Sequence, residues 1–348
     1  MSVSLFGESH GPALGCIVDG FPSGIKINQK HIQQQLDRRK PGQSKLASAR
    51  KEPDRFEIIS GIFEGKSTGA PICILIRNID AQSKDYDKLK DVFRPSHADY
   101  VYEAKYGIRD HRGGGRSSAR ITAPLVAAGA LASQLLKKIK VQAYVHSVGN
   151  IALQADFQNL NLDETEKNPI RCPDADTAKR MIQNIEKARL EGDSLGGVIA
   201  CVVKNVPIGL GEPWFEKLNA NLAKAMMSIN AAKGFEIGSG FDGVSKPGSL
   251  QNDLFEKKNG KIITLTNNSG GIQGGISNGM DIFFKVAFKA PSSISIKQPM
   301  LTKFGKEIEM PIEGRHDPCV LPRAVPIVEA LASLVIADHL LLMKSGKV

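Results

Sequence analysis

The sequence predicts an α+β protein with antiparallel sheets, built from two copies of one unit. Three observations lead to this prediction. Apolar strands flank glycine-rich hairpins, a long apolar helix closes each half of the chain, and two distant stretches read almost alike. Hairpins beside helices favour α+β over alternating βα units. No GxGxxG opens a helix after a strand and no GxxxxGK[ST] occurs, so the usual dinucleotide and P-loop signatures are absent.

The internal repeat is clearest in "GESHGPALGCIVDGFPSG" (7–24) and "GDSLGGVIACVVKNVPIG" (192–209). Seven of the eighteen positions are identical, where average residue frequencies would give about one. The first copy has His10 where the second has Leu195. The second copy keeps the glycines and the serine of the turn without the imidazole. We therefore expect that the fold of the turn does not require His10, and that this histidine has a functional role.

Two further matches follow in the same order along the chain. "SGIFEGKSTGAPI" (60–72) resembles "GGIQGGISNGMDI" (270–282), and more weakly Arg112 and Arg120 with their helix resemble Arg315 and Arg323 with theirs. We therefore expect a single domain over residues 1–348 that contains a pseudo-repeat. Its two units span about 1–140 and 190–345, and a polar connector lies around 155–190.

Each unit has the same predicted order of elements. The apolar stretches "LGCIVDG" and "IACVVKN" predict strands, and helices follow at about Gln29–Arg39 and Glu212–Ile229. Asn28 is a suitable N-cap for the first helix, and Pro41-Gly42 a suitable stop. Strands "APICILIRN" and "GMDIFFKVAFK" come next. Long apolar helices close the units at about Ala119–Lys138 and Ala324–Met343.

Composition indicates a soluble globular protein without disulfides. Hydrophobic residues make up 41% and charged residues 24% of the chain, which is ordinary for such proteins. The five cysteines are odd in number and show no CxxC spacing, so we expect neither a disulfide framework nor a metal site. The N-terminal residues lack a signal pattern, and the long apolar stretches contain polar residues. We expect a cytoplasmic protein with no membrane span.

The net charge of +10 calls for an anionic partner. Nucleic acid is one candidate. The basic residues, however, cluster with Gly, Ser and His in short loops, and no aromatic residues alternate with them as in strands that stack bases. A small, multiply charged anion in a pocket fits this pattern better than nucleic acid.

Four stretches could carry the chemistry of such a site. "GESHG" places His10 in a glycine turn, and His is suited to proton transfer near neutral pH. "RDHRGGGRSSAR" (109–120) combines arginines, serines and three glycines just before a helix, which is typical of an anion site. The basic loop 38–55 is either a solvated surface or a lid over an anionic substrate. The fourth, "GRHDPCVLPRAVP" (314–326), leads into the helix that carries Asp338.

Read together, these blocks resemble the chorismate synthase family over essentially the whole chain. The matching blocks occur in the family's order: "FGESHGPALGCIVDGFPSG", "LDRRKPG", "DVFRPSHADYVYEAKYGIRDHRGGGRSSAR", "MSINAAKG", "GGIQGGISNGM" and "GRHDPCVLPRAVPIVEA". The resemblance implies a β-α-β sandwich, with helices enclosed between antiparallel sheets, assembled as a homotetramer. It also implies the 1,4-anti elimination of phosphate from 5-enolpyruvylshikimate-3-phosphate to give chorismate, with reduced FMN as cofactor. This is a carbon-oxygen lyase reaction without net redox change, in the shikimate pathway of aromatic amino acid biosynthesis.

The resemblance also implies roles for individual residues. His10 matches the proton donor to the departing phosphate, His111 the proton donor to the N1 side of the flavin, and Asp338 the carboxylate that acts near flavin N5. The positions implied to contact FMN are Arg116, Ser117, Ser118, Asn230, Ala231, Gly274, Lys289, Ala290, Pro291, Ser292, Ser293 and Arg315. Arg39 and Lys45 match basic residues near the substrate or NADP, and we add Arg109 and Arg120 for substrate oxyanions.

The sequence departs from the family pattern in three places. "MSVSLF" stands where a strand of roughly ten residues is usual. Lys45 replaces the usual arginine and supplies a point charge instead of a bidentate fork. "KAPSS" (289–293) replaces the commoner "KPTSS", which changes the turn but keeps Lys289 and both serines.

Two other functions stay open on the sequence alone. One is a catalytically inactive, basic RNA-binding protein of the same fold, and the other is a different flavoprotein that acts on a phosphorylated acid. NADPH is a possible reductant for the flavin. Because no separate dinucleotide motif occurs, we expect the flavin to depend on an external reductant.

Overall fold

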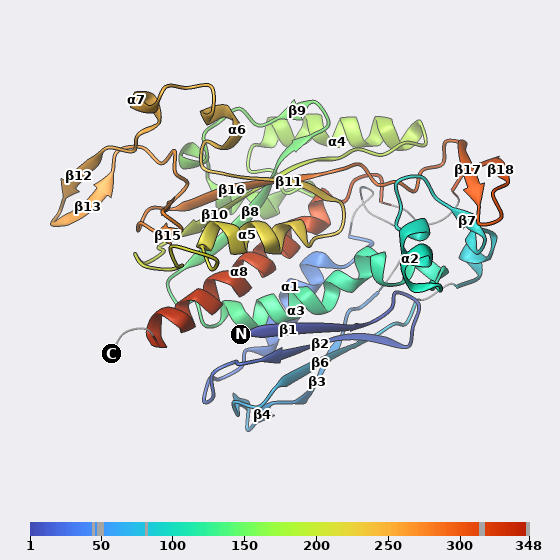
Figure 1. Ribbon diagram of the computed structural model, residues 1–348, viewed down its shortest axis with the longest axis horizontal. Coiled ribbons are helices and arrows are strands. Elements are labelled where there is room, and N and C mark those ends of the chain that lie inside the picture. Colours follow the sequence, from blue (N-terminus) through green and yellow to red (C-terminus); the bar gives the residue numbers. More distant parts are fainter. Residues whose placement is uncertain (44–45, 47–51, 81–82, 313–316, 346–348) are drawn as a thin grey trace.

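Two antiparallel sheets enclose a layer of helices, as Figure 1 shows. This computed structural model describes residues 1–43, 46, 52–80, 83–312 and 317–345. The α+β class and the sandwich arrangement expected from the sequence are confirmed. The helices of the inner layer are α1 (Gln29–Arg39), α3 (Thr122–Ser133), α5 (Leu218–Met227) and α8 (Leu321–Ser345).

The first sheet comes from the first half of the chain. Its strands, in spatial order, are β1 (Ser2–Gly7), β2 (Ala13–Asp19), β6 (Ile72–Arg77) and β3 (Phe56–Ser60). The strand β1 pairs with β2 over all six of its residues. Alternation of apolar side chains turns Leu14, Cys16 and Val18 of β2 toward the helices, where they are fully buried.

The second sheet comes from the second half. Its strands, in spatial order, are β11 (Ala232–Ile237), β16 (Ile282–Phe288), β10 (Gly197–Lys204), β8 (Lys140–Val148) and β9 (Ile151–Ala152). Residues 199–203 of β10 have no exposed surface on either face of the sheet. Helix α4 (Ala175–Leu190) packs against β8 and β9 on the side away from the inner helices (Figure 1).

Smaller elements lie at the ends of the sandwich. The short hairpins are β4–β5 (Ile62–Phe63 and Lys66–Ser67), β12–β13 (Phe255–Lys258 and Lys261–Thr264) and β14–β15 (Ile272–Gln273 and Ile276–Ser277). A third sheet joins β7 (Val92–Phe93) to β17 (Gln298–Thr302) and β18 (Glu307–Met310). The short helices are α2 (Asp99–Tyr106), α6 (Gly240–Gly243) and α7 (Gly248–Gln251), with 3-10 turns at Ser83–Leu89, Arg112–Ser117, Ala119–Ile121, Phe157–Asn159 and Leu162–Lys167.

The predicted elements agree with the structure to different degrees. Helix α1 has the predicted bounds, and the side chain of Asn28 accepts a hydrogen bond from the His31 N–H at 3.0 Å. Helix α5 begins six residues later than predicted, because residues 212–217 form a turn in which the Glu212 N–H donates to the Glu216 carbonyl. The expected polar connector around 155–190 contains α4 in its second half, as an amphipathic helix.

The two sheets agree in strand order and in register, which bears on the predicted duplication. If β1, β2, β6 and β3 correspond to β8, β10, β16 and β11, both sheets have the same order. The pair Ala13↔Arg77 in the first sheet then corresponds to Val198↔Ala287 in the second, at the sequence offsets of the two repeats. We propose that the halves are copies of one unit, the second of which begins near Lys140 and includes β8.

Helix α8 is the longest helix and runs through the centre of the molecule. By length and composition alone, its residues Leu321–Lys344 could cross a membrane, but 61% of the apolar window is buried inside the protein. The core helix of a soluble protein has the same properties. Helices α3 and α8 are in close contact, and α3 is buried almost all round.

The crossing of α3 and α8 depends on Gly129. A Cβ at this position would lie 2.3 Å from the Cβ and 2.4 Å from the Cα of Ala330. We expect Gly129→Ala to lower the free energy of unfolding by about 1–3 kcal/mol, because overpacking outweighs the gain in helix propensity. Urea denaturation measures the change. Gly248→Ala is the control, since nothing lies within 4 Å of its Cβ; equal stability of the two variants would contradict the crossing.

Candidate active site

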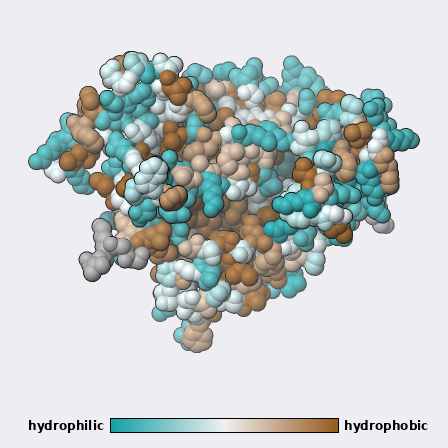
Figure 2. Space-filling model, viewed as in Figure 1, coloured by the Kyte–Doolittle hydropathy of each residue, from teal (hydrophilic) through white to brown (hydrophobic). Residues whose placement is uncertain are grey.

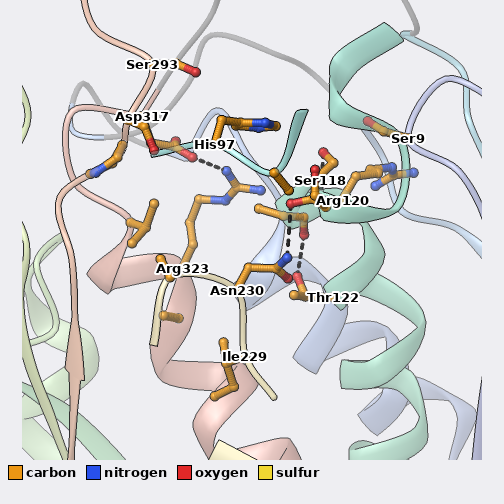
Figure 3. A pocket seen from close by; sticks show the side chains of 18 of the residues that line it. Ser9, His97, Ser118, Arg120, Thr122, Ile229, Asn230, Ser293, Asp317 and Arg323 are labelled. Carbon is orange, nitrogen blue, oxygen red and sulfur yellow. Dashed lines mark hydrogen bonds and ion pairs between the residues drawn. The ribbon is translucent and has the colours of Figure 1, made fainter. Parts of the chain in front are cut away.

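A cavity of about 370 Å³ lies at the end of the helix layer where α3 and α8 begin. Its size is within the range of small-molecule sites. The walls come from the loop before α3, the first turns of α8, residues 229–231 after α5, residues 288–293 after β16, and residues 94–98 after β7. Figure 3 shows side chains from these segments pointing toward one another. Both halves of the chain therefore contribute to one pocket.

The glycine loop before α3 has a conformation that other residues rarely adopt. Gly113, Gly114 and Gly115 have φ values of 61°, 81° and 52°. A Cβ at Gly113 would lie 2.0 Å from Cε1 of His10, so the loop packs directly on that imidazole. Ser118 then caps the 3-10 turn that leads into α3, accepting from the Arg120 N–H. The three glycines thus bring the backbone close to His10 and to the pocket.

A buried carboxylate holds two arginines at the pocket. Asp54 accepts from the guanidinium groups of Arg39 and Arg120, and the exposed fractions of the three side chains are 0%, 0% and 3%. Burial alone would raise the pKa of Asp54, but the charges of Arg39 and Arg120 outweigh it and lower that pKa. Asp54 is therefore ionised at neutral pH and stabilises both cations.

Arg39 keeps unused hydrogen-bonding capacity in this pocket. Its Nη2 donates to Asp54, but Nε and Nη1 are buried and have no hydrogen-bond partner among the residues that the structure describes. Burial lowers the pKa of Arg39 to about 10, although Asp54 opposes this shift. The side chain stays cationic at neutral pH, and its unpaired N–H groups are costly unless an anion binds.

Asp317 and Arg323 lie on the opposite wall, at the start of α8 (Figure 3). Arg323 donates from Nη1 to the Asp317 carboxylate and from Nε to the backbone carbonyl of Arg39. Asp317 is the one acidic side chain among the described residues that line the pocket. With Arg39, Arg94, Arg120, Arg323 and Lys289 around it, the lining is strongly cationic and suits a ligand with several negative charges.

Comparison with known proteins identifies the family. The family model described as chorismate synthase matches residues 1–341. The chorismate synthase of Christiangramia forsetii is 57% identical over 346 residues, which cover 99% of this chain and 97% of that protein. The chain belongs to the chorismate synthase family. The chorismate synthase of Cytophaga hutchinsonii is 56% identical, with coverage of 99% and 96%.

A solved structure supports the same assignment. A crystal structure of a chorismate synthase superposes with a TM-score of 0.78 at 31% identity, and the match covers 99% of this chain and 92% of that one. The family membership and the fold expected from the sequence are therefore shown. The comparisons give no support to the RNA-binding alternative.

Most residues that the chorismate synthase resemblance implies do meet in this pocket. The predicted residues that line it are Arg39, Ser117, Ser118, Arg120, Asn230, Ala231, Lys289, Pro291, Ser292 and Ser293. Asn230 donates from Nδ2 to the Ser117 carbonyl at 3.0 Å, which joins the second half of the chain to the glycine loop. Lys289 donates to the carbonyl of Ser96 at 3.1 Å and to Oγ of Ser292 at 2.5 Å.

Four other predicted residues lie beside the pocket without lining it. His10 is 8% exposed and lies behind Gly113, with its ring edge to face with Tyr86 at a centroid distance of 5.1 Å. His111 precedes the 3-10 turn of the glycine loop, and Arg116 donates to the Leu5 carbonyl at 3.3 Å. Ala290 lies between two lining residues. The predicted Lys45 and Arg315 lie outside the described residues.

The expected catalytic role of Asp338 needs correction. Ile327 is the last residue of α8 at the pocket, and Asp338 lies eleven residues further along, about 16 Å away. Its carboxylate instead accepts from the α-amino group of Met1. The carboxylate of the pocket is Asp317, from the "RHDPC" block.

Arg109 and Gly274 were also misplaced by the sequence interpretation. Arg109 is 6% exposed and its donors serve Asp99, Glu103 and backbone carbonyls of residues 89–92, so it secures β7 and α2 instead of binding a ligand. Gly274 lies in the β14–β15 turn next to Gly275, whose carbonyl accepts from Leu218 N–H at the start of α5. The residues that line the pocket, 229–231, follow the C-terminal end of α5, about 15 Å from the start of that helix.

Four lining residues with a charged or imidazole side chain were missed, although their sequence blocks had been recognised. They are Arg94 and His97 from "FRPSHADY", Asp317 from "RHDPC" and Arg323 from "LPRAVP". For Arg323 a usable signal existed, since it is the repeat counterpart of Arg120, which had been selected. For His97 the signal was weak, because a histidine followed two residues later by an aspartate is a common pattern.

Removing the carboxylate at position 54 should strongly destabilise the fold. We expect Asp54→Asn to lower the free energy of unfolding by about 3–5 kcal/mol, because Arg39 loses its carboxylate partner and Arg120 keeps, of the described carboxylates, only Glu52 at 3.7 Å. The lowered pKa of Asp54 means that the native protein itself loses this contribution only when the pH falls below about 4. Urea denaturation at pH 7 measures the first effect, and denaturation at pH 3 compared with pH 7 measures the second.

The control for this change is Asp37→Asn. Asp37 pairs with Lys40 on the surface, with exposed fractions of 46% and 36%, and such pairs contribute about 0–1 kcal/mol. An Asp54→Asn protein as stable as the Asp37→Asn protein would show that Asp54 is not the counterion of both arginines.

Proposed function

We propose that the protein catalyses the elimination of phosphate from 5-enolpyruvylshikimate-3-phosphate to give chorismate, with reduced FMN as cofactor. The observation that carries this proposal is the Arg39 guanidinium, fully buried at the pocket with two nitrogens that have no described partner. A buried cation with free donors suits an oxyanion. Family membership gives the oxyanion its identity, because the substrate carries a phosphate and two carboxylates.

The arginines supply the anion site on physical grounds. Asp54 pairs with Arg39 and Arg120, Glu52 lies 3.7 Å from Nη2 of Arg120, and Asp317 pairs with Arg323. The two N–H groups of Arg39 that have no described partner, together with Lys289 in the lining, are available to a phosphate or carboxylate. Positive charge near a departing phosphate makes it a better leaving group.

The remaining lining residues fit a flavin mononucleotide. Ser117, Ser118, Ser292 and Ser293 provide hydroxyl groups, and Asn230 and Lys289 provide further polar contacts, while Ile229, Ala231, Phe288 and Ile327 provide an apolar surface for a planar ring. A ligand can approach the backbone of the glycine loop closely, because Gly113, Gly114 and Gly115 have no Cβ atoms. When bound, the reduced flavin supplies electron density to the allylic system of the substrate.

In the proposed reaction the C3–O bond breaks, a ring proton leaves from C6, a double bond forms and phosphate departs. His10 is proposed to give a proton to the departing phosphate, and its place against Gly113 puts it one layer from the pocket. His111 is proposed to act on the other side of the same loop, toward the cofactor. We assign to Asp317 the carboxylate role first expected of Asp338, because Asp317 lines the pocket.

Further parts of the proposal rest on the family resemblance. They are a homotetrameric assembly, a cytoplasmic location, absence of nucleic-acid and membrane partners, and a flavin that is reduced externally, with NADPH as the possible alternative reductant. An aerobic assay driven by NADPH alone separates the two sources of electrons, since full turnover would show intrinsic reductase activity.

Arg39→Gln tests the anion site. We expect kcat/KM for the substrate to fall about a hundredfold, because hydrogen bonds from a charged group contribute about 1.5–3 kcal/mol each. Phosphate release with reduced FMN under anaerobic conditions is the measurement. Arg180→Gln, on the exposed face of α4, is the control and should keep its activity; equal activity of the two variants would remove Arg39 from the site.

His10→Ala tests the proton donor. We expect an intact fold and a turnover lowered by about two to four orders of magnitude, because general acid catalysis contributes this much. The matching stretch of the sequence has Leu195 at the position of His10, so we expect folding not to require the imidazole. A normal rate, or an unfolded protein by circular dichroism, would refute this role for His10.

A further inference from the structure

Helix α1 carries two neighbouring arginines that face different cavities. Arg39 lines the pocket described above, whereas Arg38 lines a second cavity of about 280 Å³, between α1, α3, α8 and β8. Adjacent residues of an α-helix are about 100° apart around its axis, so the two side chains point in different directions. The contacts of Arg38 therefore hold this end of the helix from outside the pocket.

Arg38 is held by two carboxylates. Its Nη1 donates to Oε2 of Glu329 at 2.5 Å and to Oε1 of Gln35 at 2.6 Å, and its Nη2 and Nε donate to Oε1 of Glu166 at 2.5 Å and 3.1 Å. Burial would lower the pKa of Arg38, but the charges of Glu329 and Glu166 and the hydrogen bonds to them outweigh it and raise that pKa. All three guanidinium nitrogens have an acceptor, which fixes the side chain in one orientation.

The pair formed by Arg38 and Glu329 is largely enclosed. Hydrophilic residues cover much of the molecular surface (Figure 2), but the exposed fractions of these two side chains are 23% and 13%. An ion pair that is shielded from water is screened less than a surface pair, and losing one partner of it is costly. This contact therefore constrains α1 more strongly than a solvated surface pair would.

Glu329 joins α1 to two other elements. It belongs to α8, and its second oxygen, Oε1, accepts from the backbone N–H of Ala143 in β8 at 2.9 Å. Arg323, six residues earlier on α8, donates from Nε to the backbone carbonyl of Arg39 at 3.3 Å. Helix α8 thus holds the end of α1 at two points, one at the pocket and one at the second cavity.

Glu166, the other partner of Arg38, is anchored to the same helix. Its Oε2 accepts from Nε of Arg171 at 3.2 Å, and Arg171 donates from Nη1 to the backbone carbonyl of Pro322 in the first turn of α8. Arg171 is itself buried. The chain of contacts through Glu166 therefore also ends at α8, and it supports the contact that Glu329 makes directly.

The exact place of Arg39 matters because of its unpaired groups. Its Nη2 donates to Asp54, while Nε and Nη1 have no partner among the described residues. Donors of a binding site must be held within about 0.5 Å of the geometry that the ligand requires. Neither Arg38 nor Glu329 is among the described residues that line the pocket, so Glu329 acts on a ligand there through the helices that it joins.

We propose that Glu329 is a positioning residue of the anion site, which holds Arg38 and thereby fixes the end of α1 that carries the Arg39 guanidinium. The inference rests on the proposed function, in which Arg39 binds an oxyanion of the substrate. The negative charge of Glu329 is essential to this role, because a carboxylate holds a guanidinium much more strongly than a neutral amide does.

A double-mutant cycle with Arg39 separates positioning from a general structural role. Glu329→Gln keeps the size of the side chain and an acceptor for the Ala143 N–H, but removes the charge. We expect kcat/KM to fall about tenfold in the parent protein, because a slightly displaced guanidinium binds the oxyanion more weakly. In the Arg39→Gln protein the same change should cost less than about twofold, because no guanidinium is left to position. The measurement is phosphate release from 5-enolpyruvylshikimate-3-phosphate with reduced FMN under anaerobic conditions.

Glu57→Gln is the matched control for this cycle. Glu57 also pairs with an arginine, but the pair with Arg77 lies on the surface, with exposed fractions of 51% and 64%. Such a pair contributes little, so Glu57→Gln should leave kcat/KM unchanged in both proteins.

Glu166→Gln is a milder second variant, because Glu166 is 48% exposed and Glu329 still holds Arg38. We expect a loss of about two- to fivefold in kcat/KM that disappears in the Arg39→Gln protein. Urea denaturation shows whether each variant is folded, and Glu166→Gln decides the outcome if the Glu329→Gln protein does not fold.

Equal losses in the parent and the Arg39→Gln proteins would show that Glu329 supports folding alone, and would overturn the inference. An unchanged kcat/KM in the folded Glu329→Gln protein would do the same. A parent protein that releases no phosphate would instead overturn the proposed function.

Discussion

The pocket depends on a single carboxylate between two guanidinium groups. Asp54 is fully buried and pairs with both Arg39 and Arg120, while Glu52, which is also buried, lies 3.7 Å from Nη2 of Arg120. Without Asp54, Arg39 would lose the charged partner that the structure gives it, at a high cost in the interior. With it, Arg39 is held in place and keeps two nitrogens without a described partner at the cavity. The helix layer, the glycine loop and the start of α8 are all arranged around this cluster.

The site is rigid because hydrogen bonds between the two halves of the chain hold its walls. Asn230 reaches the glycine loop, Lys289 and Ser292 hold the turn at Ser96, and Arg323 contacts the backbone of Arg39. Each contact joins residues more than a hundred positions apart. A pocket built in this way has its polar groups in place before any ligand arrives, which lowers the cost of binding and favours catalysis by fixed charges.

Local pattern predicted the fold well, and its failures have physical causes. Helix α1 followed its cap and stop residues, and the strands followed their apolar runs. Ten of the predicted site residues line the pocket, and they lie within contiguous sequence blocks. The predictions for Asp338 and Arg109 failed because the sequence does not reveal which group a charged residue pairs with. Asp338 pairs with the amine of Met1, and Arg109 pairs with Asp99. His97 was missed for the same reason, since it lines a pocket that only the folded chain creates.

The matching register of the two sheets has a consequence for how this site came to be asymmetric. The loop before α3 and the loop before α8 occupy equivalent places in the two halves, yet one presents glycines and the other presents Asp317. Likewise the turn with His10 has a counterpart with Leu195. A symmetric ancestor would have offered a ligand the same groups from both sides, which serves binding but cannot separate a proton donor from a proton acceptor. If the halves are copies of one unit, as we propose, divergence of the two loops would remove that restriction while both loops still contribute to one pocket.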